Sequence, residues 1–351
     1  MLQYKKGGEI MEEKIKIYIP ESINNILLKD MERFEFFKKD GSFNKNEFYN
    51  TLIMNYYEQY QNQQSDLFNH IKKTISDNVD SSESITNDIA GKILSFFDLK
   101  TNGLDEHRSE VTLSMKPTKR TSAVFDFIQN YCIENSTLSS YFRNMIASYT
   151  LLPQDRRERI IFKENFELLE KAIKDGRKVY FVTTNKDAPH IASPYSICNS
   201  KEELFNYLLA DYNSLPFSFR IGRIRKITIL NEPSEILPRN EEIFNKMEEQ
   251  GPQYSYETKK ASRQIKVYLT DRGKQMFKSI YLHRPKCSKV DGDFYYFDCS
   301  SQQAYQYFSR FGRNAIIVEP NDLTADMHKY FAMANKAYSK YVKNGSLPQD
   351  K

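Results

Sequence analysis

Four cationic side chains lie close together near the middle of the chain, at Arg220, Arg223, Arg225 and Lys226. A guanidinium group is a planar fork that can donate two hydrogen bonds to a phosphate or to a base edge. If a strand runs through this segment, alternation puts Arg223 and Arg225 on one face. Tyr195 and Tyr207 can add stacking or hydroxyl contacts. We therefore expect RNA or a nucleotide-like ligand here. The alternative is that these arginines pair with carboxylates at a domain interface.

A second group of polar side chains comes from a pattern that occurs twice: a short strand, a proline, a helix, a turn and another helix. The first strand, 14–19, ends at Pro20, and the second, 111–116, ends at Pro117. Apolar and polar residues alternate in both strands, which predicts one buried and one exposed face. The side chains expected to point outward are Lys14, Lys16, Tyr18, Thr112, Ser114 and Lys116. Two copies can pair their strands into a ribbon of the width that enters a nucleic-acid groove.

The helices of the two copies have recognisable beginnings. In the first copy, apolar residues recur at helical spacing over 23–34, and Gly41 ends that helix. Asn44 and Glu47 form a capping box for the next helix, and Thr137 caps its counterpart in the second copy. Between the copies, amphipathic stretches predict two support helices, at 67–75 and 85–97, and a turn at 101–103.

Both copies resemble the ribbon-helix-helix motif of bacterial repressors and plasmid proteins, most closely over 137–143. The resemblance implies that outward strand residues enter the major groove and that the start of each second helix holds a backbone phosphate. It assigns strand contacts to Lys14, Lys16, Tyr18, Thr112 and Ser114. It assigns phosphate contacts to the backbone at Asn44, Lys45, Thr137 and Leu138. The alternative is a dimer-like scaffold that does not touch nucleic acid.

The middle of the chain follows a polar stretch at 151–158 that we interpret as a domain boundary. A helix is expected over 166–173. Short strands are then expected at 179–182, 204–209, 217–221 and 224–230. Short strands at this spacing after one helix predict a small barrel.

The same region resembles the WYL domain, an Sm-like barrel found in many bacterial regulators. The family's proline matches Pro194, and its Trp-Tyr-Leu triplet falls on Asn206-Tyr207-Leu208. Its Phe-Arg-x-x-Arg-Ile sequence matches Phe219 to Ile224. The resemblance implies that nucleic acid or a nucleotide-like ligand binds in the pocket of the barrel.

The C-terminal region begins after a polar segment, 239–262, that we expect to be a loop or lid. Strands are predicted at 265–269, 294–297 and 315–319. Helices are predicted from Asp271, over 301–310 and over 324–342. This order implies a small α/β sandwich. It resembles the extension that follows WYL domains, through Gly312 and the run 318–323, and the resemblance implies dimerisation. The alternative is a monomeric packing domain.

Composition argues against several classes of protein. Four cysteines without CxxC spacing favour reduced thiols in the cytoplasm over zinc or disulfides. No apolar run approaches the length of a membrane-spanning helix. The five histidines are scattered and there is no phosphate-binding glycine loop, so we expect no catalytic residues, no metal and no cofactor. A net charge of +5 permits a polyanionic partner. The segment before Met11 reads like a translated ribosome-binding site, so we expect translation to begin at Met11.

The sequence therefore predicts an α+β protein with a tandem ribbon-helix-helix at 11–150, a WYL barrel at 156–238 and a dimerisation domain at 262–345. The whole arrangement resembles the WYL-containing accessory proteins of type VI-D CRISPR systems. That resemblance implies a homodimer whose partners are single-stranded RNA and an RNA-guided RNase, which it stimulates without catalysis. The first alternative is a ligand-sensing transcription regulator that binds operator DNA through the ribbon. The second is a scaffold that touches only protein.

Overall fold

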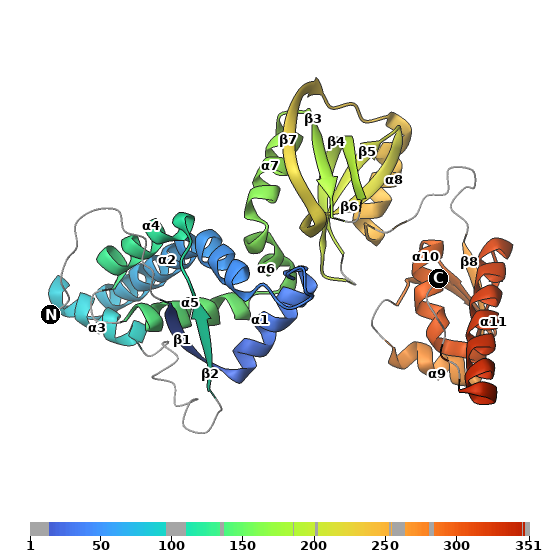
Figure 1. Cartoon of the computed structure of the whole chain (residues 1–351), viewed down its shortest axis with the longest axis horizontal. Helices are drawn as coiled ribbons and strands as arrows, with labels where there is room; N and C mark the ends of the chain where they lie inside the picture. Colours follow the sequence, from blue (N-terminus) through green and yellow to red (C-terminus); the bar gives the residue numbers. More distant parts are fainter. Residues whose placement is uncertain are drawn as a thin grey trace. The chain divides into compact units, whose positions relative to one another are not determined.

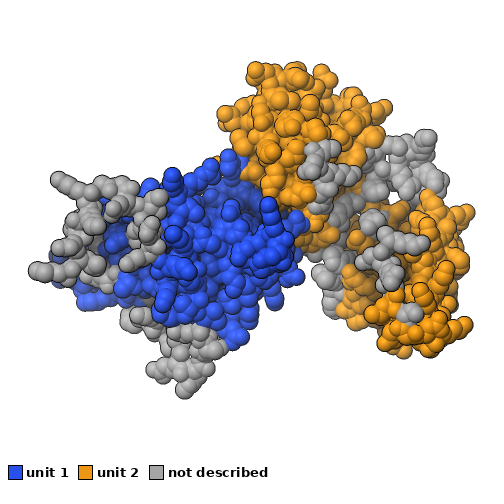
Figure 2. Space-filling model, viewed as in Figure 1, with its two compact units in different colours: residues 1–164 blue, residues 165–351 orange. Residues whose placement is uncertain are grey.

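The computed structural model describes residues 14–95, 110–133, 137–184, 186–200, 203–252, 254, 264–280, 284–345 and 347. Expectations for Met11, for Phe96 and Phe97, and for the turn at 101–103 lie outside these residues. The chain divides into two compact units, Met1–Glu164 and Asn165–Lys351 (Figure 2). Each mixes helices with antiparallel sheet, so the predicted α+β class is confirmed. None of the described helices has the length and apolar character needed to span a membrane.

The first unit is built around a two-stranded antiparallel ribbon of β1 (Ile15–Pro20) and β2 (Glu110–Met115) (Figure 1). Ile15 lies opposite Met115 and Pro20 opposite Glu110, so the two copies of the sequence pattern do pair their strands. Ile17 and Leu113 face each other on the inner side and are almost fully buried. One face of the ribbon therefore belongs to the core and the other is left for solvent.

Helices pack against the ribbon and against one another. Their bounds are α1 Glu21–Arg33, α2 Lys45–Asn78, α3 Glu83–Ser95, α4 Lys119–Phe127, η1 Ile128–Cys132, α5 Leu138–Leu151 and α6 Gln154–Ile161. The predicted caps Asn44 and Thr137 are in place at α2 and α5. The helix expected at 67–75 is not separate, because no glycine or proline interrupts α2. The polar stretch expected to separate domains contains α6.

A buried ion pair fixes α6 to α1 and α5. Arg157 donates from Nε to Asp30 Oδ2 at 2.7 Å and from Nη2 to Asp30 Oδ1 at 3.0 Å. The Tyr149 hydroxyl donates to the same carboxylate at 2.9 Å. Burial, followed by the charge of Asp30, raises the pKa of Tyr149 well above its ordinary value. The Asp30 carboxylate is fully buried and accepts these three hydrogen bonds. It therefore holds α1, α5 and α6 of the first unit together.

The boundary between the units falls within α7 (Lys163–Lys174), and the second unit continues with an antiparallel sheet in the order β6-β5-β4-β3-β7. The strand bounds are β3 Arg177–Thr183, β4 Lys186–Asn199, β5 Asn206–Tyr212, β6 Leu215–Arg220 and β7 Ile224–Pro233. The described pairings do not join β6 to β7, so the sheet is not closed and the predicted barrel is not confirmed. Long β4 was not predicted, because it contains Pro189 and Pro194, and prolines are rare inside strands.

Two further helical segments complete this part. The turn η2 (Ile221–Arg223) separates β6 from β7. Helix α8 (Pro238–Gln250) occupies much of the segment expected to be a loop or lid, so that expectation was wrong. Pro238 at the first helical turn fits this start, since proline has no N–H to lose there. Phe244 and Met247 of α8 pack in a buried cluster with Cys198 and Leu209.

The C-terminal part is a second antiparallel sheet, of order β11-β8-β10-β9. Its elements are β8 Ile265–Leu269, α9 Asp271–Ser279, β9 Cys287–Asp291, β10 Phe294–Phe297, α10 Ser301–Phe308, η3 Ser309–Asn314, β11 Ala315–Glu319 and α11 Asn321–Asn344. Strand β9 was not predicted, because Cys287–Asp291 is short and mostly polar. Val267 and Phe297, on one face of the sheet, share a core with Phe308 of α10.

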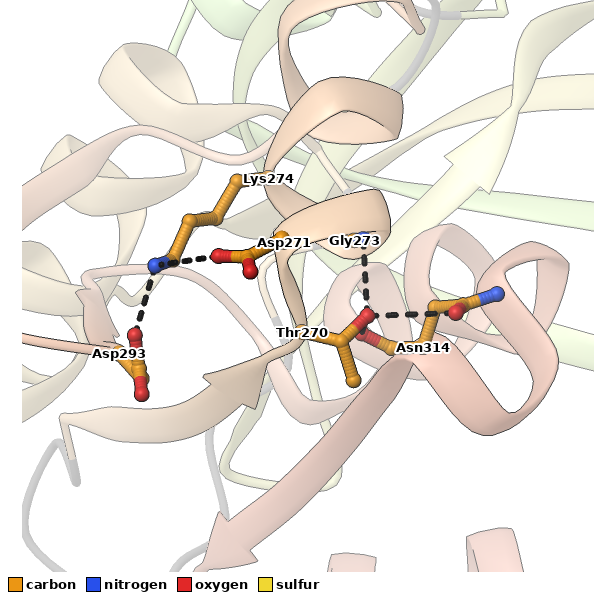
Figure 3. A network of polar contacts seen from close by, with 6 residues as sticks. All are labelled: Thr270, Asp271, Gly273, Lys274, Asp293 and Asn314. Atoms are coloured by element: carbon orange, nitrogen blue, oxygen red, sulfur yellow. Dashed lines mark hydrogen bonds and ion pairs between the residues drawn. The ribbon is translucent and has the colours of Figure 1, made fainter.

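A polar network holds the junction of β8 and α9 (Figure 3). Thr270 Oγ1 caps α9 by accepting from the Gly273 N–H at 3.0 Å and donates to Asn314 Oδ1 at 3.2 Å. Lys274 contacts Asp293 Oδ1, in the β9–β10 turn, at 2.6 Å. A Cβ at Gly273 would lie 2.1 Å from the Asn314 carbonyl oxygen, so this close approach requires glycine. The network thereby fixes β8, β10 and β11 relative to one another.

Candidate nucleic-acid interface

The outer face of the ribbon carries a compact group of exposed side chains, which we call the ribbon face: Lys14, Lys16, Tyr18, Thr112 and Ser114. Lys16 lies opposite Ser114, and Tyr18 lies opposite Thr112. The predicted outward direction of these residues is confirmed. Tyr18 is 42% exposed although it is a large aromatic residue. An exposed ring beside two lysines can stack on a base while the cations pair with phosphates.

A hollow of about 630 Å³ lies beside this face, at the start of α2. Its lining is Lys38, Gly41, Ser42, Phe43, Asn44, Lys45, Asn46 and Ser114. It therefore brings together Asn44, Lys45 and Ser114, which the sequence assigned to separate elements. The positive end of the α2 dipole and two lysines make the hollow suited to an anion such as a phosphate.

The loop that forms one wall of the hollow is ordered by its own contacts. Asp40 accepts from both the N–H and the hydroxyl of Ser42, at 3.0 and 2.7 Å, and the side-chain bond is the main reason that the pKa of Asp40 is lowered. Phe37 and Phe43 stack with centroids 5.4 Å apart. The Asp40 carboxylate therefore uses its Oδ1 to hold the loop through Ser42.

Two asparagines of α2 hold the end of β2, a contact that the sequence did not reveal. Asn46 Oδ1 accepts from the Lys116 N–H at 2.8 Å, and Asn50 Nδ2 donates to the Lys116 carbonyl at 3.1 Å. Asn50 Oδ1 also accepts from the Thr121 hydroxyl at 2.6 Å. These groups are about 70 residues apart in the chain, so only pairing of the two copies brings them together.

The second copy repeats this arrangement with different chemistry. Thr137 Oγ1 caps α5 by accepting from the Ser140 N–H at 3.1 Å. Ser139 donates to the Lys16 carbonyl at 3.0 Å, which ties α5 to β1 as the asparagines tie α2 to β2. No lysine or arginine occurs over 137–140, and Arg143 is buried. The segment 137–140 therefore supplies no cation of its own, unlike the first copy, where Lys45 follows Asn44 directly.

The arginine-rich segment is not the continuous strand that would align its cations. Because η2 interrupts it, the condition for placing Arg223 and Arg225 on one face is not met. Arg225 Nη1 donates to the carbonyls of Gly222 at 2.7 Å and Ile224 at 2.9 Å. Lys226 is exposed and has a positive φ of 53°, at an irregularity in the β3–β7 pairing.

Arg220 and the two predicted tyrosines also make internal contacts. The Arg220 guanidinium lies 3.3 Å from the ring centre of Phe205. Tyr207 lies opposite Arg220 in the sheet, but its ring is buried and its hydroxyl donates to Glu203 at 2.5 Å. Tyr195 stacks on Phe244 of α8, with centroids 4.6 Å apart, and burial raises its pKa. The side chains of Arg220, Tyr207 and Tyr195 therefore make contacts with other residues of the same fold.

We found no arrangement for metal or redox chemistry in the described residues. No three histidine, cysteine or acidic side chains gather there in a way that could hold a metal ion. All four cysteines lie within the described ranges, and none forms a disulfide.

Comparison with known proteins adds a fold-level relationship. No protein-family model matches the chain, and no curated protein matches it. The crystal structure of a CRISPR Cas-related protein matches with a TM-score of 0.69 and 19% identity, over 97% of each chain. Proteasome accessory factor B/C of Arthrobacter aurescens gives a TM-score of 0.23 and 13% identity, over 62% of this chain and 35% of its own. The first match confirms the expected resemblance to CRISPR-associated proteins at the level of the fold.

Proposed function

We propose that this protein is a non-catalytic accessory protein of a CRISPR system and that it binds single-stranded RNA. The observation that carries the proposal is the ribbon face, which sets exposed Lys14, Lys16 and Tyr18 beside the hollow with Lys38 and Lys45. The fold shared with a CRISPR Cas-related protein supports the cellular setting. Stimulation of an RNA-guided RNase and homodimerisation belong to the same proposal.

Single-stranded RNA is favoured because the ribbon face has few groups that read bases in a duplex. In the major groove, arginine or lysine reads guanine, and asparagine or glutamine reads adenine, through two hydrogen bonds to one base. Of these four residue types the ribbon face carries only lysine. The paired positions here are Lys16 with Ser114 and Tyr18 with Thr112. A tyrosine beside two lysines suits sequence-tolerant stacking and phosphate pairing instead.

The arginine-rich segment has a secondary place in this proposal. We propose that the sheet β3–β7 corresponds to the Sm-like barrel of WYL domains, with Arg220 just before its last turn and Arg223 at the end of that turn. The contacts of Arg220 with Phe205, and of Arg225 with backbone carbonyls, support structural roles for these two side chains. Exposed Lys226 is the residue of this segment best suited to meet a phosphate.

Operator DNA is the second candidate, and one observation favours it. An antiparallel two-stranded ribbon has the dimensions to enter the major groove of B-DNA. A transcription regulator of this kind would prefer a palindromic duplex over random duplex DNA by a factor of roughly a thousand or more.

The experiment that separates the two candidates compares single-stranded RNA, single-stranded DNA, random duplex and palindromic duplex DNA over a salt series. The proposal predicts strongest binding to single-stranded RNA, with an affinity that falls steeply with salt and varies little with sequence. Strong preference for one duplex would establish the regulator instead. A second assay adds the protein to an RNA-guided RNase and measures the cleavage rate, which should rise.

A further inference from the structure

The outward face of the C-terminal sheet is not covered by the helices that pack on its other side. Along β8, Ile265, Val267 and Leu269 are buried, whereas Lys266 and Tyr268 alternate with them and point the other way. On β10, Phe297 is buried, whereas Phe294 is exposed. The two central strands of the sheet therefore have one face in the core and one face toward solvent.

The strand register gathers three aromatic rings on this outward face. Phe294 lies opposite Tyr268, and their ring centroids are 5.8 Å apart. Tyr296 lies opposite Lys266 on the same face. We call Lys266, Tyr268, Lys289, Phe294 and Tyr296 the C-terminal sheet face. Tyr295, between the two β10 residues, packs against Phe277 of α9 on the helical side.

Lysines are interleaved with these rings. Lys266 Nζ lies 4.7 Å from the Phe294 ring centre and 5.8 Å from that of Tyr296. Lys289 Nζ, from β9, lies 5.2 Å from the ring centre of Tyr296. Their acidic neighbours are at the long end of ion-pair distances, 3.8 Å for Lys266 to Glu319 and 3.7 Å for Lys289 to Asp291. Such surface pairs contribute little free energy, so a phosphate can replace the carboxylate as partner.

The order of elements strengthens the comparison with known RNA-binding surfaces. Strands and helices follow as β8-α9-β9-β10-α10-β11, with β8 and β10 in the centre of the sheet. This is the split β-α-β arrangement. RNA recognition motifs use a four-stranded sheet whose exposed aromatic residues stack two or three bases. Phe294 and Tyr296 are two residues apart on one strand, roughly 7 Å, so each ring can take a separate base.

We infer that the C-terminal sheet face is a second binding surface for single-stranded RNA, with Tyr268, Phe294 and Tyr296 stacking on bases and Lys266 and Lys289 pairing with phosphates. The inference takes its ligand from the proposed function but rests on different residues from the ribbon face. Asp291 and Glu319 lie opposite Phe294 and Lys266, so the lysines of this face are matched by two carboxylates. What favours RNA over an apolar protein partner is the ring geometry, with Lys266 beside Phe294 and Lys289 beside Tyr296.

The test uses the full chain with single-stranded RNA that contains photoreactive 4-thiouridine. Cross-linked peptides are identified by mass spectrometry, and affinities are measured in parallel. The main variant is Phe294→Ala with Tyr296→Ala. The ring-preserving control is Phe294→Tyr with Tyr296→Phe. The positional control is Val290→Ala, because Val290 is 53% exposed but lies opposite Tyr295, and so on the other side of the sheet.

The inference predicts cross-links in the peptide that contains β10. It also predicts an affinity roughly tenfold weaker for each ring lost in the alanine variant. Both controls should bind within about twofold of the wild type. A further variant, Lys266→Gln with Lys289→Gln, keeps every ring. It should reduce the slope of log affinity against log salt concentration by about 1.4, which is about 0.7 for each phosphate contact.

Two results would overturn the inference while leaving the proposed function standing. One is wild-type affinity in both the alanine and the lysine variants, together with cross-links confined to the ribbon. The other is a change in oligomeric state of the alanine variant with unchanged RNA binding, which would make the face a protein interface. If the wild type binds no single-stranded RNA, both proposals fail. If substitution of Lys16 and Tyr18 weakens binding but the β10 cross-links persist, the two surfaces are independent.

Discussion

The ribbon face and the arginine-rich segment both concentrate cationic side chains, but these side chains are held differently. Lys16 and Tyr18 project from β1, whose backbone is fixed by pairing with β2, and their side chains are exposed. Arg220 stacks on Phe205, and Arg225 donates to two backbone carbonyls. A local excess of arginine in sequence therefore need not create a surface for a polyanion. What matters is whether the fold already uses the hydrogen-bond donors.

The largest expected effect comes from breaking the support of the ribbon. Asp30→Ala leaves Arg157 buried without its carboxylate and should cost about 3–5 kcal/mol of unfolding free energy. Hydrogen exchange followed by mass spectrometry should show faster exchange throughout 14–164, with little change in the sheet that carries the arginine-rich segment. Asp40→Ala is the matched control, since Asp40 bonds only within an exposed loop. Equal destabilisation by both variants would contradict the role given to the buried pair.

A smaller effect is expected where α2 holds the second strand. Asn50→Ala removes hydrogen bonds to the Lys116 carbonyl and to Thr121, and leaves buried groups without partners. The loss should be about 1–3 kcal/mol, measured by denaturant unfolding. RNA binding should weaken as well, because the hollow beside Ser114 loses a fixed wall. Asn55→Ala, which loses contacts with α6 instead, serves as the comparison and should leave RNA affinity unchanged once folded.

Sequence patterns gave the ribbon correctly because alternation is a local property. Inward isoleucines and outward Lys16 and Tyr18 follow directly from a period of two. The contact of Asn50 with Lys116 could not be predicted, since it depends on the pairing of two distant copies. Likewise, nothing local to the arginines indicates the turn η2 that interrupts their strand. The anion-suited hollow combines Lys38, Lys45 and Ser114, which come from three segments.

The other elements that the sequence did not predict have identifiable causes. Pro189 and Pro194 concealed β4, because neither can donate a strand hydrogen bond, and the pairing is irregular beside Pro194. The polar composition of α8 suggested a loop, although the helix buries Phe244 and Met247 on one side. Strands β8 and β10 were predicted, but their aromatic outward face emerged only when the register placed Tyr268 beside Phe294.

The arginine side of the comparison predicts an effect on stability rather than on binding. Arg220→Lys keeps the charge but removes the planar group that lies over Phe205. We expect a loss of about 1 kcal/mol in unfolding free energy, from the weaker cation–π contact. The affinity for single-stranded RNA should remain within about twofold. A large fall in affinity with unchanged thermal stability would place Arg220 in the interface instead.

At neutral pH, the smallest expected effect on the unfolding free energy comes from Tyr49. Burial raises the pKa of Tyr49, on α2, to about 12. Because its folded-state pKa is above the value of 10.0 for an exposed tyrosine, the resulting stability is present below pH 10 and is lost as the pH rises toward 12. Tyr49→Phe should therefore reduce the alkaline loss of unfolding free energy while changing little at pH 7. An unchanged alkaline profile would show that other groups dominate it.

The central claim, that RNA binding depends on the ribbon face and the hollow beside it more than on the arginine-rich segment, is tested most directly by one set of titrations. Single-stranded RNA affinity is measured against salt for the wild type, for Lys16→Gln with Lys45→Gln, and for Arg223→Gln with Lys226→Gln. The account predicts that the ribbon variant binds about tenfold more weakly and loses about 1.4 of the salt slope. It predicts that the arginine-segment variant changes by less than about threefold. The opposite ranking, with the ribbon variant at wild-type affinity, would contradict it.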